Sequence, residues 1–152
     1  MKKQSAGILA YKYDSILEVF LVHPGGPFYK LKDEGVWSIP KGEYTDDEIP
    51  LEVAKREFHE ETGNVIKEEN FIPLKDVTLK SGKRISAWAI NINSELSFIN
   101  SNTFDIEWPP KSGKIVSFPE VDKAEWFSIE VAKTKIHPAQ VDFLKCLENI
   151  LN

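Results

Sequence analysis

The sequence predicts an α/β domain. Runs of aliphatic and aromatic residues at 6–13, 17–23 and 84–92 are typical of β-strands. A charged segment that ends at Gly63 and an apolar stripe near the C-terminus both indicate helices. The chain has 152 residues, of which 41% are hydrophobic, so it can bury a core, and we expect one domain over residues 1–152.

The first two strands are expected at Ala6–Tyr13 and Leu17–His23, where a short polar bend between them favours a hairpin. The next segment, HPGGPFYKLKDEG, contains two prolines and three glycines and predicts a loop that rims a site. Within it, Phe28 and Tyr29 could stack on a nucleobase, and the nearby lysines could contact phosphates. Coverage of the core edge explains both aromatic residues equally well.

A short strand is expected at Val36–Ile39, and it leads through Pro40 and Lys41 to Gly42. Glycine at this point allows the backbone to approach a bound ion or phosphate closely. Lys41 is a candidate phosphate contact, although a solvated lysine accounts for it as well.

The acidic segment that follows predicts a helix. Asp47 can cap its N-terminus, Pro50 falls in the first turn, where a missing N–H costs nothing, and Gly63 ends it. At about 100° per residue one face of this helix is apolar, and it consists of Leu51, Ala54 and Phe58.

Three glutamates, Glu57, Glu60 and Glu61, gather on an adjoining face of the same helix. Carboxylates this close repel one another and raise each other's pKa unless a cation neutralises them. Oxygen ligands without cysteine or histidine favour Mg²⁺, Mn²⁺ or Ca²⁺ over zinc. The alternative is a solvated acidic face supported by an i,i+4 pair from Glu52 to Arg56.

The spacing in this region resembles the Nudix box of Nudix hydrolases. Agreement by chance at seven fixed positions is on the order of 10⁻⁸ per starting point, if each residue type occurs about once in fifteen. The box normally closes with an aliphatic residue, but this chain has Asn64 there, and we expect altered packing after the helix with the metal site intact. The seven matching residues are Gly42, Glu48, Arg56, Glu57, Glu60, Glu61 and Gly63.

The resemblance implies an α/β/α sandwich around a mixed β-sheet. It also implies hydrolysis of a nucleoside diphosphate linked to another moiety, with Mg²⁺ as cofactor and Mn²⁺ as a substitute. By resemblance, Gly42 offers its carbonyl to the metal together with the three helix glutamates, which also serve catalysis. Glu48 and Arg56 form a charge pair that fixes the loop against the helix, and Gly63 supports the site.

After the helix, strands are expected at Phe71–Leu79 and Arg84–Ile92, and residues 93–102 are polar and loop-like. Residues 101–114 mix aromatic, acidic and basic side chains, which suits a substrate loop, with Trp108 and Lys111 as candidate contacts. A surface loop without function explains the same composition. The last strand is expected at 124–127, followed by two helices at 128–135 and from 137 onward.

One further acidic residue is expected near the metal. In many Nudix enzymes a glutamate before a strand of the EWFS type completes the metal site or accepts the proton of water, and by resemblance Glu120 takes that role. Glu107 is the other candidate for this role. None of His23, His59 and His137 has a second ligand at metal spacing, so they are interpreted as structural or surface residues.

Composition excludes several classes of protein. The net charge of −5 argues against broad binding to nucleic acid or to an anionic membrane. A single cysteine, Cys146, suits a reducing compartment, and no stretch resembles a signal peptide or a membrane span, so cytoplasmic residence is expected.

The expected substrate is a small nucleotide or another pyrophosphate compound. Trp37, Pro40, Lys41 and Gly42 form a WxxPKG pattern that resembles relatives acting on dinucleoside polyphosphates and diphosphoinositol polyphosphates. Other segments resemble small bacterial Nudix proteins that are predicted NTP pyrophosphohydrolases. NTPs and dinucleoside polyphosphates are therefore favoured. Two alternatives stay open: a Nudix-fold module that binds nucleotide without turnover, and an RNA 5′-pyrophosphohydrolase. The sequence leaves the oligomeric state open.

Overall fold

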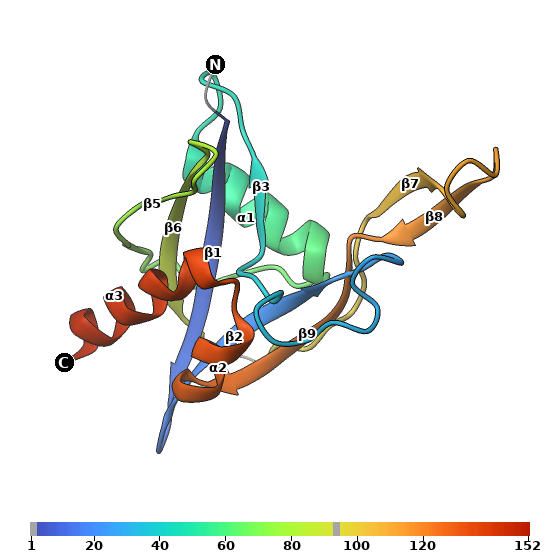
Figure 1. The fold of residues 1–152 in the computed structure, drawn as a ribbon. Helices are drawn as coiled ribbons and strands as arrows, with labels where there is room; N and C mark the ends of the chain where they lie inside the picture. The colour runs from blue at the N-terminus through green and yellow to red at the C-terminus, as the bar shows by residue number, and fades with distance from the viewer. Residues whose placement is uncertain (1–2, 93–94) are drawn as a thin grey trace.

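The computed structural model describes residues 3–92 and 95–152, so the first two residues of the expected loop at 93–102 lie outside the described residues. Figure 1 shows a central sheet with helices on both sides and a hairpin that projects from the body. In chain order the elements are β1 Gln4–Tyr13, β2 Leu17–Pro24, β3 Lys41–Glu43, α1 Pro50–Thr62, β4 Ile72–Pro73, β5 Val77–Thr78, β6 Arg84–Asn91, β7 Thr103–Glu107, β8 Ile115–Pro119, β9 Val121–Ser128, α2 Ile129–Lys135, the 3₁₀ turn η1 Pro138–Gln140 and α3 Val141–Leu151.

The main sheet is mixed, with the order β4-β6-β1-β2-β9, while β3 also pairs with β1 and β5 with β6. Strand β1 is parallel to β6 along its length and antiparallel to β2 and β3. Its other edge is divided: residues 5–7 pair with β3 and residues 11–13 with β2. β3 and β2 therefore pair with different parts of β1, and the point where they separate lies next to the candidate site.

Two apolar cores, one on each face of the sheet, confirm the expected sandwich. On β1, Leu9 and Tyr11 pack on the face covered by α2 and α3, while Ile8 and Ala10 pack on the face covered by α1. This alternation is the period of two that a strand buried on both faces shows. Strand β2 follows the same pattern, and the expected β1–β2 hairpin is present.

Helix α1 begins and ends almost where the sequence predicts, but its N-terminal cap is different. Ile49 holds the cap position without a side-chain hydrogen bond, so the prediction of Asp47 as cap is wrong. The Asp47 carboxylate instead accepts from the Thr45 hydroxyl two residues earlier, as short polar side chains do in turns. At the other end Gly63 has a φ of 83°, and its N–H donates to the His59 carbonyl at 2.8 Å.

Asn64, the departure from the box, is buried and fully bonded. Its side-chain amide donates to the Ser97 carbonyl at 2.7 Å and to the Thr62 hydroxyl at 3.1 Å. The amide therefore ties the end of α1 to the segment before β7, where an aliphatic residue would only pack.

Two expected strands differ in the structure. Residues 36–39 form only isolated bridges, because the backbone N–H of Ile39 donates to the side chain of Gln140 at 3.1 Å and not to a neighbouring strand. Residues 71–79 form two short strands, β4 and β5, because Pro73 has no N–H to continue the ladder.

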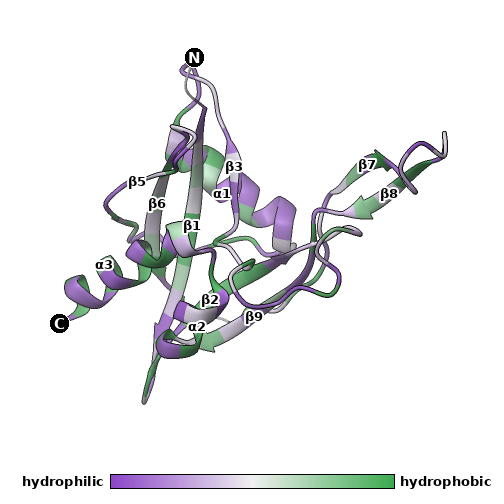
Figure 2. Ribbon diagram, viewed as in Figure 1, coloured by the Kyte–Doolittle hydropathy of each residue, from purple (hydrophilic) through white to green (hydrophobic). Residues whose placement is uncertain are grey.

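The expected substrate loop at 101–114 is largely a hairpin. Strand β7 pairs with β8 in register from Thr103–Pro119 to Glu107–Ile115. Phe104, Ile106 and Trp108 alternate with polar residues, which is a strand pattern that the mixed composition obscured. The hairpin carries both hydrophobic and hydrophilic residues along its length, as Figure 2 shows.

The two C-terminal helices are present as expected, except that Pro138 begins a 3₁₀ turn before α3. Ser128 caps α2 by accepting from the Val131 N–H at 3.3 Å. Leu144 and Leu147 of α3 are fully buried. No helix within the described residues is both long enough and apolar enough to cross a membrane.

Candidate active site

The site is built where β3 passes α1. A Cβ atom at Gly42 would lie 2.1 Å from Cδ of Glu57, so any side chain here would displace the Glu57 carboxylate from its place beside the strand. The stripe of Val53, Ala54 and Phe58 anchors the helix in the core, and its polar residues are then turned toward β3 and solvent. Hydrophilic residues dominate α1 in Figure 2.

Glu61 is the most buried carboxylate of the helix, with 7% of its surface exposed. It accepts the backbone N–H of Lys41 and interacts with Glu57 through a side-chain hydrogen bond. Burial, and then the charge of Glu57, raise the pKa of Glu61 from 4.5 to about 9. Burial and the charge of Glu60 likewise raise the pKa of Glu57. Burial and neighbouring negative charge thus favour the protonated form of both groups, and a bound cation would favour the ionised form.

Arg56 lies among three carboxylates. Its Nη1 is 3.4 Å from Oε2 of Glu48, its Nη2 is 3.9 Å from Oε1 of Glu57, and its Nε is 3.7 Å from Oε1 of Glu60. The other oxygen of Glu48 accepts the backbone N–H of Thr45 at 2.9 Å, and this bond lowers the pKa of Glu48. Glu48 and Arg56 thus connect the loop before α1 to the helix.

Of the two candidates for a further carboxylate, only Glu120 lies near the helix glutamates. Burial, and then the charge of Glu60, raise its pKa, and its own charge acts on Glu57 and Glu61. Glu107 is used elsewhere: its carboxylate accepts the backbone N–H groups of Lys111 and Gly113 at the tip of the β7–β8 hairpin.

Asn102 is a site residue that sequence reasoning missed. Its N–H donates to the Glu60 carbonyl at 2.9 Å, and its carbonyl accepts the Glu120 N–H at the same distance. One residue therefore connects α1 to the segment that carries Glu120. Both bonds are backbone bonds, so no residue type could have indicated them.

Lys41 and two of the carboxylates line one cavity of about 220 Å³. Burial and the neighbouring charge of Lys83 lower the pKa of Lys41, while Glu61 acts in the opposite sense. The cavity joins apolar walls to one cation and two carboxyl groups, as small-molecule sites commonly do. Its lining residues are Val22, Pro24, Val36, Ser38, Ile39, Lys41, Glu61, Glu120 and Val121.

The remaining candidate substrate contacts lie outside this cavity. Phe28 and Tyr29 are 55% and 40% exposed on the loop after β2. The Phe28 ring meets Trp108 edge to face at 5.5 Å, and Trp108 begins the hairpin tip that also carries Lys111. Trp108 follows Asn102 by six positions, which corresponds to about 20 Å of extended chain.

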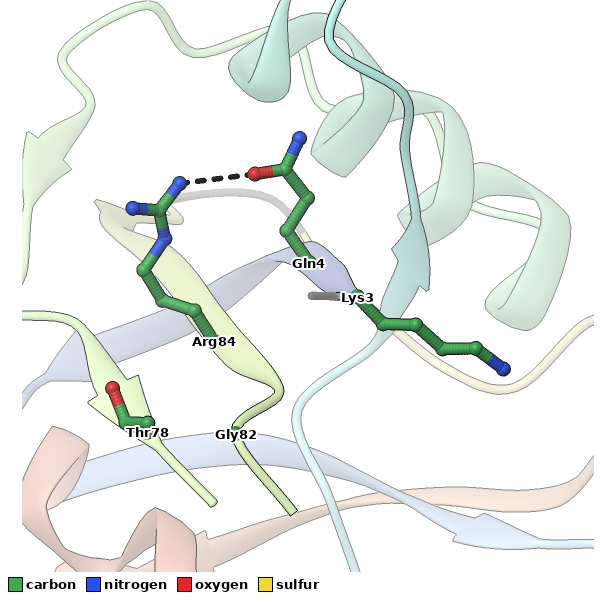
Figure 3. Close-up of a pocket in the computed structure, with 5 residues that line it drawn as sticks. All are labelled: Lys3, Gln4, Thr78, Gly82 and Arg84. Carbon is green, nitrogen blue, oxygen red and sulfur yellow. Dashed lines mark hydrogen bonds between the residues drawn. The ribbon is translucent and has the colours of Figure 1, made fainter. Parts of the chain in front are cut away.

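A second hollow, of about 190 Å³, shares no residue with the first. Figure 3 shows Arg84 bonded to Gln4 within it, while the side chain of Lys3 extends away from Arg84. Arg84 also lies 3.7 Å from Asp76. Its charge is thus already compensated, and we assign this hollow no part in the candidate site.

The donor set fits a hard divalent cation. Two carboxyl groups with raised pKa values, those of Glu57 and Glu61, lie next to the backbone of Gly42, and such oxygen donors suit a hard ion. Among the described residues no three His, Cys, Asp or Glu side chains converge closely enough to hold an ion as they stand. Mutual repulsion and the contacts of Arg56 with Glu57 and Glu60 are consistent with this spread.

Comparisons with known proteins agree with this geometry. Residues 1–147 match the NUDIX domain family. The chain therefore belongs to that family. A search of curated proteins finds no match.

Solved structures share the fold at low sequence identity. An Ap4A hydrolase from C. elegans, in a binary complex, is 18% identical with a TM-score of 0.65, and the match covers 97% of each chain. The NUDIX domain of Shewanella oneidensis NrtR, complexed with ADP ribose, is 15% identical with a TM-score of 0.67, covering 100% of this chain and 90% of that one. A MutT/nudix family protein from Enterococcus faecalis is 16% identical with a TM-score of 0.65, covering 99% and 62%.

Membership of this family and the intact box support an enzyme that cleaves phosphoanhydride bonds, a Nudix hydrolase. The box glutamates Glu57, Glu60 and Glu61 are all present, and Glu57 and Glu61 lie together beside Gly42 and Lys41.

Proposed function

We propose that this hydrolase uses Mg²⁺, with Mn²⁺ as a substitute, to cleave a pyrophosphate bond in a nucleotide. The observation that carries the proposal is that the buried Glu61 and the partly buried Glu57 lie together beside Gly42, where burial and neighbouring negative charge raise the pKa of both carboxyl groups. A site that concentrates negative charge in a partly apolar cavity is suited to a divalent cation.

The residues that would hold the cation are Glu57, Glu60, Glu61 and Glu120, with the carbonyl of Gly42. A bound divalent cation neutralises the charge of phosphate oxygens and makes water more acidic. Glu120 is exposed enough to accept a proton from water, because it lies at the rim of the cavity and not in the core. Its position beside the helix carboxylates favours it over Glu107.

Lys41 would bind a phosphate oxygen of the substrate, since it lines the cavity with Glu61 and Glu120 and carries a positive charge there. Arg56 and Glu48 would hold the glutamates in place and take no part in the chemistry. Gly63 supports the site by ending α1 directly after Glu61 and Thr62. The whole span of residues 1–152 would act as one domain.

The position of the hairpin tip indicates how long the substrate is. Trp108 follows Asn102, the residue that bonds to Glu60, by six positions, which is about 20 Å of extended chain, and Lys111 lies further along the tip. If Trp108 and Lys111 contact substrate, they contact a part of it that is remote from the phosphates in the cavity. A dinucleoside polyphosphate has a second nucleoside to place there, so it is favoured over an NTP.

A nucleotide ligand also agrees with a structural neighbour that holds ADP ribose. The single cysteine, Cys146, suits a reducing compartment, and we propose cytoplasmic residence on that ground.

The test is a panel of pyrophosphate compounds: NTPs, dinucleoside polyphosphates and ADP-ribose, each with Mg²⁺, with Mn²⁺ and with a chelator. We expect turnover only with metal and the highest kcat/KM for a dinucleoside polyphosphate. Glu61→Gln should abolish most turnover, while Glu125→Gln, at an exposed position on β9, should leave it unchanged. Binding without turnover across the panel would instead support a nucleotide-binding module.

The bond that breaks can be assigned with the best substrate of that panel. Hydrolysis in ¹⁸O-water labels the product that receives the attacking oxygen, and mass spectrometry of the products then identifies the phosphorus attacked. Equal turnover with and without chelator would contradict the metal proposal.

A further inference from the structure

His23 is a buried titratable residue that the proposed chemistry does not use. It is fully buried near the end of β2, between Val22 and Pro24, which both line the carboxylate cavity. Because side chains alternate along a strand, His23 points to the opposite face of the sheet. There its ring meets Trp37 edge to face at 5.2 Å.

Both ring nitrogens of His23 face acceptors. Nδ1 is 2.6 Å from a carboxylate oxygen of Asp122, and Nε2 is 2.7 Å from the backbone carbonyl of Lys32. A carbonyl oxygen has no proton to donate, so Nε2 must carry one. The His23 side chain thus bridges the Asp122 carboxylate and the backbone of the loop.

These bonds connect the two ends of the loop 25–35 to β9. At the start of the loop, the Gly25 N–H donates to the Glu120 carbonyl at 2.8 Å. At the other end, His23 joins the Lys32 carbonyl to Asp122, two residues after Glu120. Between these two attachments the loop exposes Phe28 and Tyr29.

The end of the loop has a second support on the same side. Nε1 of the buried Trp37 donates to Asp33 at 2.8 Å, and Asp33 is also paired with Lys135 on α2. The His23 ring packs against this tryptophan, so loss of the imidazole would remove a direct bond to the loop and a contact beneath it.

We propose that His23 is a positioning residue, which through its bonds to Asp122 and the Lys32 carbonyl holds the loop 25–35 beside Glu120. It touches neither substrate nor metal in this assignment and acts through the loop and β9. The role in turnover rests on the proposed function, but the attachment of the loop does not.

The first test compares His23→Gln with His59→Gln, a control at an exposed position on α1. We expect His23→Gln to speed hydrogen exchange of the Gly25 and Lys32 amides about tenfold, with exchange in α1 unchanged. We also expect kcat/KM to fall about 10- to 100-fold, mainly through KM, since the loop carries the proposed substrate contacts. His59→Gln should change neither the exchange rates of the loop amides nor kcat/KM. Unchanged loop exchange in a folded His23→Gln protein would overturn the proposal.

The second test does not depend on turnover or on the stability of His23→Gln. Asp122→Ala, at a position whose side chain is 30% exposed, removes the carboxylate partner of His23 and should also speed hydrogen exchange of the Gly25 and Lys32 amides. Unchanged loop exchange in a folded Asp122→Ala protein would overturn the proposal. If loop exchange responds to both substitutions but no substrate is turned over, the proposed function fails and the loop attachment stands.

Discussion

The buried carboxyl group of Glu61 makes the stability of the metal-free protein depend on pH. Its pKa is about 9 in the folded state against 4.5 when unperturbed. Between these values the folded protein binds a proton that the unfolded chain has lost, so the stability falls as pH rises from about 5 to about 8. Three pH units at 1.36 kcal/mol each correspond to about 4 kcal/mol.

A loss of this size is a large part of the total stability of a domain, which is roughly 5–15 kcal/mol. For a chain of this length it corresponds to a decrease in Tm on the order of 10 °C. The measurement is thermal unfolding in chelator at pH 5, 6, 7 and 8 for the wild-type protein, Glu61→Gln and Glu125→Gln. Glutamine cannot ionise, so the difference in Tm between Glu61→Gln and wild type should grow steadily with pH, while Glu125→Gln should follow the wild type.

Divalent metal should reverse the effect. Carboxylates must be deprotonated to bind an ion, so excess Mg²⁺ or Mn²⁺ should raise the Tm of the wild-type protein more at pH 8 than at pH 5. A wild-type Tm that rises from pH 5 to pH 8 in chelator, in parallel with that of Glu61→Gln, would refute the reasoning about Glu61.

Three further substitutions test the geometry around the helix. Gly42→Ala places a Cβ 2.1 Å from Cδ of Glu57 and should lower kcat by at least tenfold in steady-state assays; unchanged kcat would contradict the close approach. Arg56→Ala removes the bonds to the neighbouring carboxylates and should cost about 1–2 kcal/mol in urea unfolding as well as activity, so loss of activity alone would contradict its structural part. Asn64→Ala removes the bond to the Ser97 carbonyl and should destabilise the fold by about 1–3 kcal/mol while kcat is retained. A parallel loss of kcat would show that the active site depends on this bond.

The centre of the site could be predicted because its residues follow one another on a helix. Spacing alone places Glu57 and Glu61 on one face, and Gly63 fixes where that helix ends. Glu120 is different: it comes from a distant segment, and only resemblance to a family suggested it. The bonds through Asn102 that bring it close are backbone bonds without a sequence pattern.

The errors have physical causes of the same kind. The strand expected at 36–39 is reduced to isolated bridges such as Ser38 with Val22, because the side chain of Gln140, about a hundred residues later, takes the Ile39 N–H. Residues 101–114 were read as a loop because composition was weighed more than the alternation of Phe104 and Ile106 with polar neighbours. Asp47 fitted the preference for a helix cap, but a nearer hydroxyl on Thr45 was the better partner.

The hairpin and the strands beside the carboxylates are separate parts of the molecule. β3 and the start of β1 keep Gly42 against Glu57, whereas the β7–β8 hairpin forms a sheet of its own and branches away from the body (Figure 1). Protein engineers could therefore exchange residues 103–119 for hairpins of other lengths and leave the hydrolytic machinery unaltered. A library of such variants would test which ligands each hairpin accepts, while the residues around Glu57 and Glu61 stay the same.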